Sequence, residues 1–309
     1  LAAAVAAVVH AQDPVDASHS RAEHIAVVYG QDRPEYRLIV EGIRKRTRRA
    51  VKVYDFRQRK SVLNQVVASL TADRPVAVVA VGGTALKHLQ GRTPRGVPML
   101  FAGVLRPEGY LDQDTPMPGI RLDVDVAHKV AHFLAHFPKR TRIGLVYDPD
   151  TSAGEVIAIR AAAKRAGATV VARAAKDMKE AFSMLDEVVP RVDAFLVLAD
   201  SFSAGREAFA RLRLLSLRHR VPVIGLGKSH VEQSALLAHE VDWQELGLQA
   251  GELADEVVAG QARSIVLSPR RTSVLYDSRS AAALKIPVPK SLKESATDLA
   301  VKEEEAPNR

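Results

Sequence analysis

The chain has 309 residues, of which 47% are apolar and 26% charged, a balance typical of a soluble globular protein with room for two domains. It contains no cysteine, which excludes a disulfide framework, thiol chemistry and a thiolate metal site. The net charge of +8 comes from scattered arginines and indicates a solvated basic surface, with a basic patch facing an acidic partner or membrane surface as the alternative. Zinc-finger spacing and an aromatic-rich platform are both missing, so we expect no nucleic-acid partner.

The first eleven residues, LAAAVAAVVHA, are apolar and end in Val9-His10-Ala11, an A-x-A-like cleavage sequence. This pattern is typical of the tail of a secretory signal peptide, and it is too short to span a bilayer as a helix. An alanine-rich helix is the alternative interpretation. Residues 12–23 are polar and are expected to form a linker. We therefore expect a mature protein in the periplasm or another extracytoplasmic space.

Short apolar runs then alternate with amphipathic stretches, in two series. The first series predicts strands near 24–30, 51–56, 76–82 and 97–102, with helices near 34–49, 61–73 and 84–90. The second predicts strands near 142–147, 168–173, 193–198 and 221–225, with helices near 125–137, 153–166, 177–188 and 204–219. The strands are almost continuously Val, Leu and Ile, which indicates burial on both faces. The predicted fold class is α/β, with two Rossmann-like, doubly wound parallel-sheet lobes.

The segment 235–261 predicts a short strand and a long helix, and 264–277 predicts one or two further strands. We expect a first lobe of 24–118 plus about 237–262, and a second lobe of 119–236 plus about 263–290. The polar, charged segment 291–309 is predicted to be a disordered tail. Ligands of open α/β sheets bind beyond the carboxyl ends of the strands, so two facing lobes predict one cleft that closes by a hinge.

The chain resembles the substrate-binding proteins of bacterial ABC transporters, of the type I periplasmic-binding-protein group with tryptophan- and tyrosine-type amino-acid binders. The resemblance runs from about His24 to Pro289. It is carried by VVYGQDRPEYRLIVEGIRK, VAVGGTALKHL, VPMLFAGV, RIGLVYDPDTSAGEVIAIRAAAKRAGATV, VDAFLVLADS, HRVPVIGLGKSHVEQSALLAHEVDWQELGLQAGELADEVVAGQ and LKIPVP. It implies capture of a small, amino-acid-like solute without catalysis, and delivery to a membrane permease and its ATPase. A periplasmic sensor that presents the solute to a membrane receptor or kinase is the alternative.

Candidate ligand-binding residues follow the predicted strands. In the first lobe, polar loop residues and glycines that admit a close backbone approach are Gln31, Arg33, Tyr36, Gly83, Thr84, Ala102 and Gly103. In the second lobe, the predicted helix start at Asp148, Thr151 and Ser152 suits a ligand carboxylate. The acid Asp200, at a predicted strand end, suits a ligand ammonium group. Ser201 and Gly225 also follow predicted strands and are further candidates. Helix capping and tight turns are the alternative roles of these residues.

Other motifs point to no chemistry. The stretch PVIGLGKSH lacks the first glycine of a P-loop, because Pro222 stands there, so we expect no nucleotide and no other cofactor. His128, His132 and His136 share one helix face, opposite an apolar stripe, and are expected to point to solvent rather than to hold a metal. A nucleophile elbow is also missing, so no catalytic residue is predicted.

Overall fold

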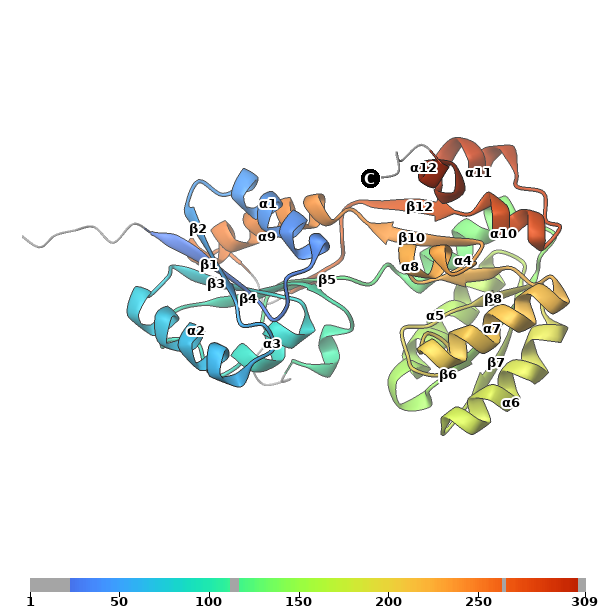
Figure 1. The fold of residues 1–309 in the computed structure, drawn as a ribbon, viewed down its shortest axis with the longest axis horizontal. Helices are drawn as coiled ribbons and strands as arrows, with labels where there is room; N and C mark the ends of the chain where they lie inside the picture. The colour runs from blue at the N-terminus through green and yellow to red at the C-terminus, as the bar shows by residue number, and fades with distance from the viewer. Residues whose placement is uncertain (1–22, 112–116, 263–264, 305–309) are drawn as a thin grey trace, which may run out of the picture.

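The computed structural model describes residues 23–111, 117–262 and 265–304, which form two α/β lobes lying side by side (Figure 1). The expected signal remnant at 1–11, and the linker up to residue 22, lie outside the described residues. No helix in the described part of the chain has the length and hydropathy needed to cross a bilayer.

The first lobe has a six-stranded sheet in the order β11-β5-β4-β3-β1-β2, with all neighbours parallel. Its strands are β1 (His24–Tyr29), β2 (Ala50–Asp55), β3 (Ala77–Val81), β4 (Met99–Val104), β5 (Gly119–Arg121) and β11 (Val266–Leu267). The core on one face includes α1 (Pro34–Arg46) and α9 (Trp243–Val258), and the core on the other includes α2 (Lys60–Asp73) and α3 (Gly83–Leu89). The central strand β3 is buried along its whole length, as its unbroken apolar sequence predicts.

The second lobe has a seven-stranded sheet in the order β13-β12-β10-β9-β8-β6-β7. Its strands are β6 (Arg142–Tyr147), β7 (Thr169–Ala174), β8 (Ala194–Leu196), β9 (Val223–Gly225), β10 (Leu237–Val241), β12 (Thr272–Tyr276) and β13 (Thr297–Asp298). The pairing of β12 with β10 is antiparallel. One face packs against α4 (Val126–His136), α5 (Pro149–Arg165) and α10 (Ser278–Ala283), and the other against α6 (Met178–Val188) and α7 (Arg206–His219).

Aspartates begin many of these helices. The side chains of Asp125, Asp148, Asp177, Asp242 and Asp277 each accept a hydrogen bond from a backbone N–H in the first turn of the following helix. Such caps satisfy donors that have no partner within the helix. They also fix the direction in which each helix leaves the preceding segment.

The chain passes between the lobes at three places in the described residues: after β5, between β10 and α9, and between β11 and β12. The lobe boundaries therefore differ from the expected ones. Residues 237–241 pair with β9 and β12 in the second sheet, whereas β5 and β11 belong to the first sheet. These assignments depend on pairing between distant segments, which the local pattern does not contain.

The segment after residue 290 also differs from the expected disordered tail over the described residues. It forms α11 (Lys290–Ser295), β13 and α12 (Leu299–Glu304), and β13 pairs with β12. Leu292, Leu299 and Ala300 are buried on the second lobe. The Asp298 carboxylate accepts a hydrogen bond from the Ser278 backbone N–H at 3.1 Å. A few apolar anchors in a polar sequence are thus enough to dock this segment.

Candidate ligand-binding cleft

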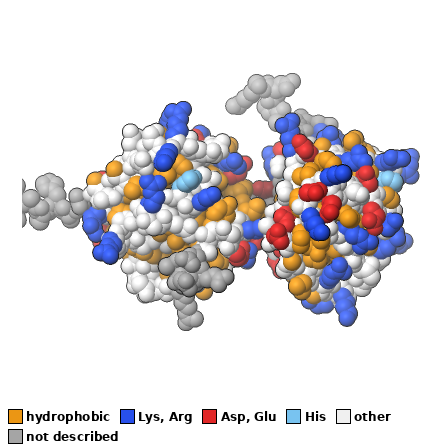
Figure 2. Space-filling model, turned by 90° about the horizontal axis from the view of Figure 1, so that it is seen from below, with side chains coloured by type: hydrophobic (Ala, Val, Ile, Leu, Met, Phe, Trp, Pro, Cys, Tyr) orange, Lys and Arg blue, Asp and Glu red, His pale blue; other side chains and the backbone are white. Residues whose placement is uncertain are grey.

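A cavity of about 650 Å³ lies between the lobes, a size that suits a small solute. It is lined by the first crossing segment, 121–126, by the ends of β8, β9 and β10, and by parts of α1, α4 and α5. Figure 2 shows the narrow waist where the two lobes meet. Charged side chains of both signs line the cavity: Glu35, Arg121, Asp123, Asp125, Lys129, Glu155, Lys228 and Glu240.

None of the predicted site residues is part of the lining of this cavity, although some of their neighbours in the sequence are. Glu35 lies between the predicted Arg33 and Tyr36, and Leu105 follows Gly103 by two positions. Ala199 and Leu226, which line the cavity, are the immediate neighbours of Asp200 and Gly225. Several of the predicted loops therefore place neighbouring positions, rather than the predicted residues themselves, at the cavity. Direct ligand contact by the thirteen residues stays a prediction.

In the first lobe, two tyrosines lie over the double glycine at the start of α3. A Cβ atom at Gly82 would lie 2.3 Å from the Tyr36 hydroxyl, and one at Gly83 would lie 2.7 Å from the Tyr110 hydroxyl. Gly82 also has a φ of +79°, in the region that favours glycine. Glycine at position 82 is therefore favoured by its backbone conformation, and a side chain at either position would displace the tyrosine that covers it.

The other predicted first-lobe residues have different surroundings. The exposed Arg33 donates to Gln31 at 3.3 Å, and its guanidinium lies 5.9 Å from the centre of the Tyr36 ring. Thr84 is exposed, whereas Ala102 and Gly103 are buried at the end of β4. Of these residues, the exposed ones are those that a ligand or the opposite lobe can reach.

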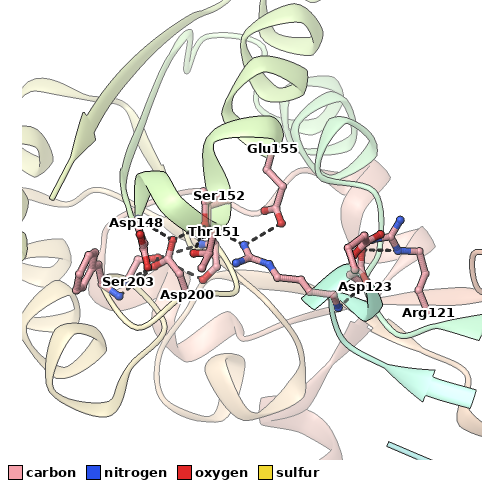
Figure 3. A network of polar contacts seen from close by, with 12 residues as sticks. Arg121, Asp123, Asp148, Thr151, Ser152, Glu155, Asp200 and Ser203 are labelled. Atoms are coloured by element: carbon pink, nitrogen blue, oxygen red, sulfur yellow. Dashed lines mark hydrogen bonds and ion pairs between the residues drawn. The ribbon is translucent and has the colours of Figure 1, made fainter. Parts of the chain in front are cut away.

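In the second lobe, Asp200 organises the loops that were expected to bind the ligand (Figure 3). Its carboxylate is buried and accepts hydrogen bonds from the Ser152 hydroxyl at 2.7 Å and from the Asp148 backbone N–H at 3.2 Å. The backbone N–H groups of Phe202 and Ser203 donate to its other oxygen at 3.0 and 3.2 Å. The carboxylate is thus satisfied by its own lobe.

The remaining second-lobe residues fall into two groups. Asp148 caps α5 by accepting from the Asp150 N–H at 2.9 Å, so this helix start is already supplied with a carboxylate. Thr151 is exposed in the first turn of α5 and Ser201 in the turn after β8, while Gly225 is buried beneath His230. The exposed hydroxyls are the parts of this loop cluster that remain open to a ligand.

We expect Asp200→Ala to lower the free energy of unfolding by about 3 kcal/mol, because it leaves several buried donors without an acceptor. Asp200→Asn keeps one acceptor oxygen and should lose less. Urea denaturation of both variants measures this effect. Unchanged stability together with weaker binding of an ammonium-bearing ligand would contradict the structural role and support the predicted ligand contact.

Arg106 joins the two lobes. It follows β4 in the first lobe, and its guanidinium donates to the Ser152 hydroxyl at 3.0 Å and pairs with Glu155 of α5 at 2.8 Å. Burial raises the pKa of Glu155, and the charge of Arg106 opposes this change. In Figure 3, Glu155 extends from α5 between the Asp200 cluster and the Arg121–Asp123 pair. Neither Arg106 nor Glu155 was predicted from the sequence, because an ion pair between lobes has no local pattern.

The histidines of α4 do not all point to solvent, contrary to expectation. His128 is exposed, but the rings of His132 and His136 are half-buried, with their centres 4.6 Å apart. The buried His239 of β10 lies 4.9 Å from His132 and 5.5 Å from His128, measured between ring centres. The expectation failed because α4 has covered surfaces on two sides, the apolar core and β10. In the described part of the chain, no three metal-ligating side chains are arranged to hold a metal ion.

Comparisons with known proteins agree with this architecture. A tyrosine-binding protein of Clostridioides difficile (strain R20291) is 22% identical over 207 residues, which cover 64% of this chain and 59% of that protein, so the chain spans less than two thirds of this relative's length. The ligand-free, open structure of a substrate-binding protein with adhesive properties from Clostridium difficile has a TM-score of 0.73 at 18% identity, covering 90% of this chain and 99% of that one.

An ABC domain from Streptococcus pneumonia in complex with L-Trp has a TM-score of 0.60 at 22% identity, covering 89% of this chain and 99% of that one. These structures confirm the predicted fold class of two parallel-sheet lobes. The family model described as ABC transporter substrate binding protein matches residues 38–299. This family is a binding class and not a catalytic one. The chain belongs to the ABC transporter substrate-binding protein family.

Proposed function

We propose that this protein captures a small, polar, amino-acid-like solute outside the cytoplasm and delivers it to the permease and ATPase of an ABC transporter. The observation that carries this proposal is the cavity of about 650 Å³ between the lobes, to which both lobes contribute charged side chains. A site shared by two lobes couples ligand binding to their relative position. Delivery and location rest on family membership and on the predicted signal sequence.

The three crossings give a physical basis for closure. A ligand between the lobes gains contacts when the strand ends of the second lobe approach those of the first, and this difference in contacts drives the population shift. The exposed predicted residues, Gln31, Arg33, Thr84, Thr151 and Ser201, are then candidates for contacts made on closure. The Arg106–Glu155 pair, which already joins the lobes, is a candidate guide for that movement.

An amino-acid-like ligand is supported by two independent features. The cavity lining contains carboxylates and cations, as a zwitterion requires. The matched relatives are described as a tyrosine-binding protein and as a complex with L-Trp. Neutral sugars need hydrogen-bonding groups but no such pair of charges.

A thermal-shift panel of the purified protein tests this function. Amino acids are expected to raise the melting temperature, since a ligand at a hundred times its Kd adds about 2.7 kcal/mol of stability. Neutral sugars and nucleosides of similar size serve as controls. Stabilisation by these controls alone would contradict the amino-acid assignment.

A further inference from the structure

Lys129 is a buried cation at the cavity wall. It lies in the first turn of α4, is only 4% exposed and lines the cavity. Within the described residues, its ammonium group has no hydrogen-bond or ion-pair partner. The other basic residues of the lining are paired: Arg121 with Asp123 at 2.7 Å, and Lys228 with Glu232 at 3.2 Å. Among the described lysines and arginines of the lining, Lys129 is therefore the one whose charge has no partner in the protein and is available to a ligand.

The acidic residues whose charges influence the pKa of Lys129 make their close contacts with other groups. Burial lowers the pKa of Lys129, and Glu155, Asp123, Asp125 and Glu240 oppose this change through their charges. Each has its own close partner in the described structure. Glu155 forms an ion pair with Arg106 at 2.8 Å, and Asp123 forms one with Arg121. The Asp125 carboxylate accepts a hydrogen bond from the Ala127 backbone N–H at 2.9 Å. The Glu240 carboxylate accepts hydrogen bonds from the Lys228 backbone N–H at 2.7 Å and from the Trp243 indole N–H at 2.8 Å.

These contacts argue against a purely structural role for Lys129. If Lys129 formed a structural ion pair, a carboxylate would lie within hydrogen-bond distance of its ammonium group. The four acids make such close contacts with other groups and not with Lys129. The Lys129 side chain is almost entirely buried and its residue lines the cavity, so an ammonium group without such a partner is poorly solvated and costs free energy. A bound anion at this position recovers that cost, so the site favours an anionic ligand group over water.

The first lobe supplies the complementary charge. Glu35 lies in the first turn of α1 and lines the same cavity. It too has no hydrogen-bond or ion-pair partner among the residues that the structure describes. The cavity thus holds one unpaired cation in the second lobe and one unpaired carboxylate in the first, and a ligand that satisfies both must carry both charges.

We propose that Lys129 binds the carboxylate of the ligand and that Glu35 binds its ammonium group, so that a zwitterion bridges the two lobes. This assignment rests on the proposed function and deepens it. It differs from the expectation that the start of α5 binds the carboxylate. The Asp148 side chain already caps that helix, and the hydroxyl of Ser152 donates to Asp200.

Isothermal titration of wild type and Lys129→Met tests the assignment. The probes are the amino acids, their carboxamides, a series of simple carboxylic acids, and neutral sugars and nucleosides. We expect Lys129→Met to weaken amino-acid binding at least tenfold, about 1.4 kcal/mol. It should also abolish the preference of wild type for the free acid over the carboxamide. Lys139→Met, the same change at an exposed position outside the cavity, is the matched control.

A second measurement covers the possibility that Lys129→Met affects folding. Removing an unpaired buried charge should raise the melting temperature of the ligand-free protein, whereas loss of a structural ion pair would lower it. A lowered melting temperature, or a variant that still prefers the acid to the carboxamide, overturns the Lys129 assignment and leaves the proposed function intact. Binding of simple carboxylic acids that depends on Lys129, without amino-acid binding, supports the Lys129 assignment and contradicts both the Glu35 assignment and the proposed function. Binding of neutral probes alone, or of none, contradicts both.

Discussion

Replacing Gly247 with valine is expected to lower the free energy of unfolding by about 3 kcal/mol, because α1 and α9 pack backbone against backbone at this point. A Cβ atom at Gly247 would lie 2.3 Å from the Ile39 carbonyl oxygen and 2.9 Å from the Gly42 Cα atom. A Cβ atom at Gly42 would likewise lie 2.3 Å from the Gln244 carbonyl oxygen. Backbone atoms cannot rotate away as a flexible side chain does, so the helices must separate.

The expected separation also reaches the cavity. The helix α9 begins at Trp243, directly after the second crossing, and Trp243 lines the cavity. Moving α9 away from α1 therefore shifts both the crossing and one wall of the site. We expect Gly247→Val to weaken ligand binding in addition to lowering stability, although Gly247 itself does not line the cavity.

Urea denaturation at neutral pH measures the stability effect, and Gly154→Ala is the matched control. Gly154 is also inside a helix, α5, but a Cβ atom there would meet nothing within 4 Å. Alanine at this position should stabilise the protein by roughly 0.5–1 kcal/mol, since glycine is the poorer helix former. Equal effects of the two substitutions would show that the contact between α1 and α9 does not require glycine.

Much of the fold was predictable, because strands buried on both faces have an unmistakable composition. The run HIAVVY becomes β1 and RIGLVY becomes β6, each buried at its centre. The end of the chain was not predictable in the same way. Its anchors, Leu292 and Leu299, are isolated in a polar sequence, and their burial depends on a docking surface formed elsewhere in the chain.

Strand ends are local features, so the sequence predicts polar loops around Tyr36, Asp148 and Asp200, and their contact with a ligand stays a prediction. The cavity also uses a crossing segment and two helix faces, whose meeting depends on how the lobes pack. One local signal was overlooked: Lys129 stands four residues before Phe133, on the buried side of α4, where a lysine is unusual.

Acidification from pH 7 to pH 5 is expected to lower the free energy of unfolding by about 4 kcal/mol, because two buried histidines resist protonation in the folded state. Burial lowers the pKa of His239 to about 3 and that of His230 to about 4. The positive charge of Lys129 adds to both effects, and His132 and His128 of α4 add to the effect on His239.

The sign follows from the proton balance. In the unfolded chain these histidines take up protons below about pH 6.5, while in the folded protein they stay neutral down to about pH 4 or below. The unfolded state therefore binds more protons in this window, and stability falls as the pH falls from 6.5. Each histidine contributes about 2 kcal/mol by pH 5. His132, half-buried with a pKa lowered to about 4, acts in the same direction.

Urea denaturation at pH 7 and pH 5 tests this expectation, with His239→Leu as the informative variant. Leucine removes a ring whose two nitrogens have no hydrogen-bond partner among the residues that the structure describes, so it should reduce the loss on acidification by about half. His219→Gln, at an exposed position on α7, is the control and should leave the loss as in wild type. A wild-type protein equally stable at both pH values would mean that water or a structural change relieves the buried rings. Because His239 also lines the cavity, such a structural change on acidification would also alter the surroundings of Lys129.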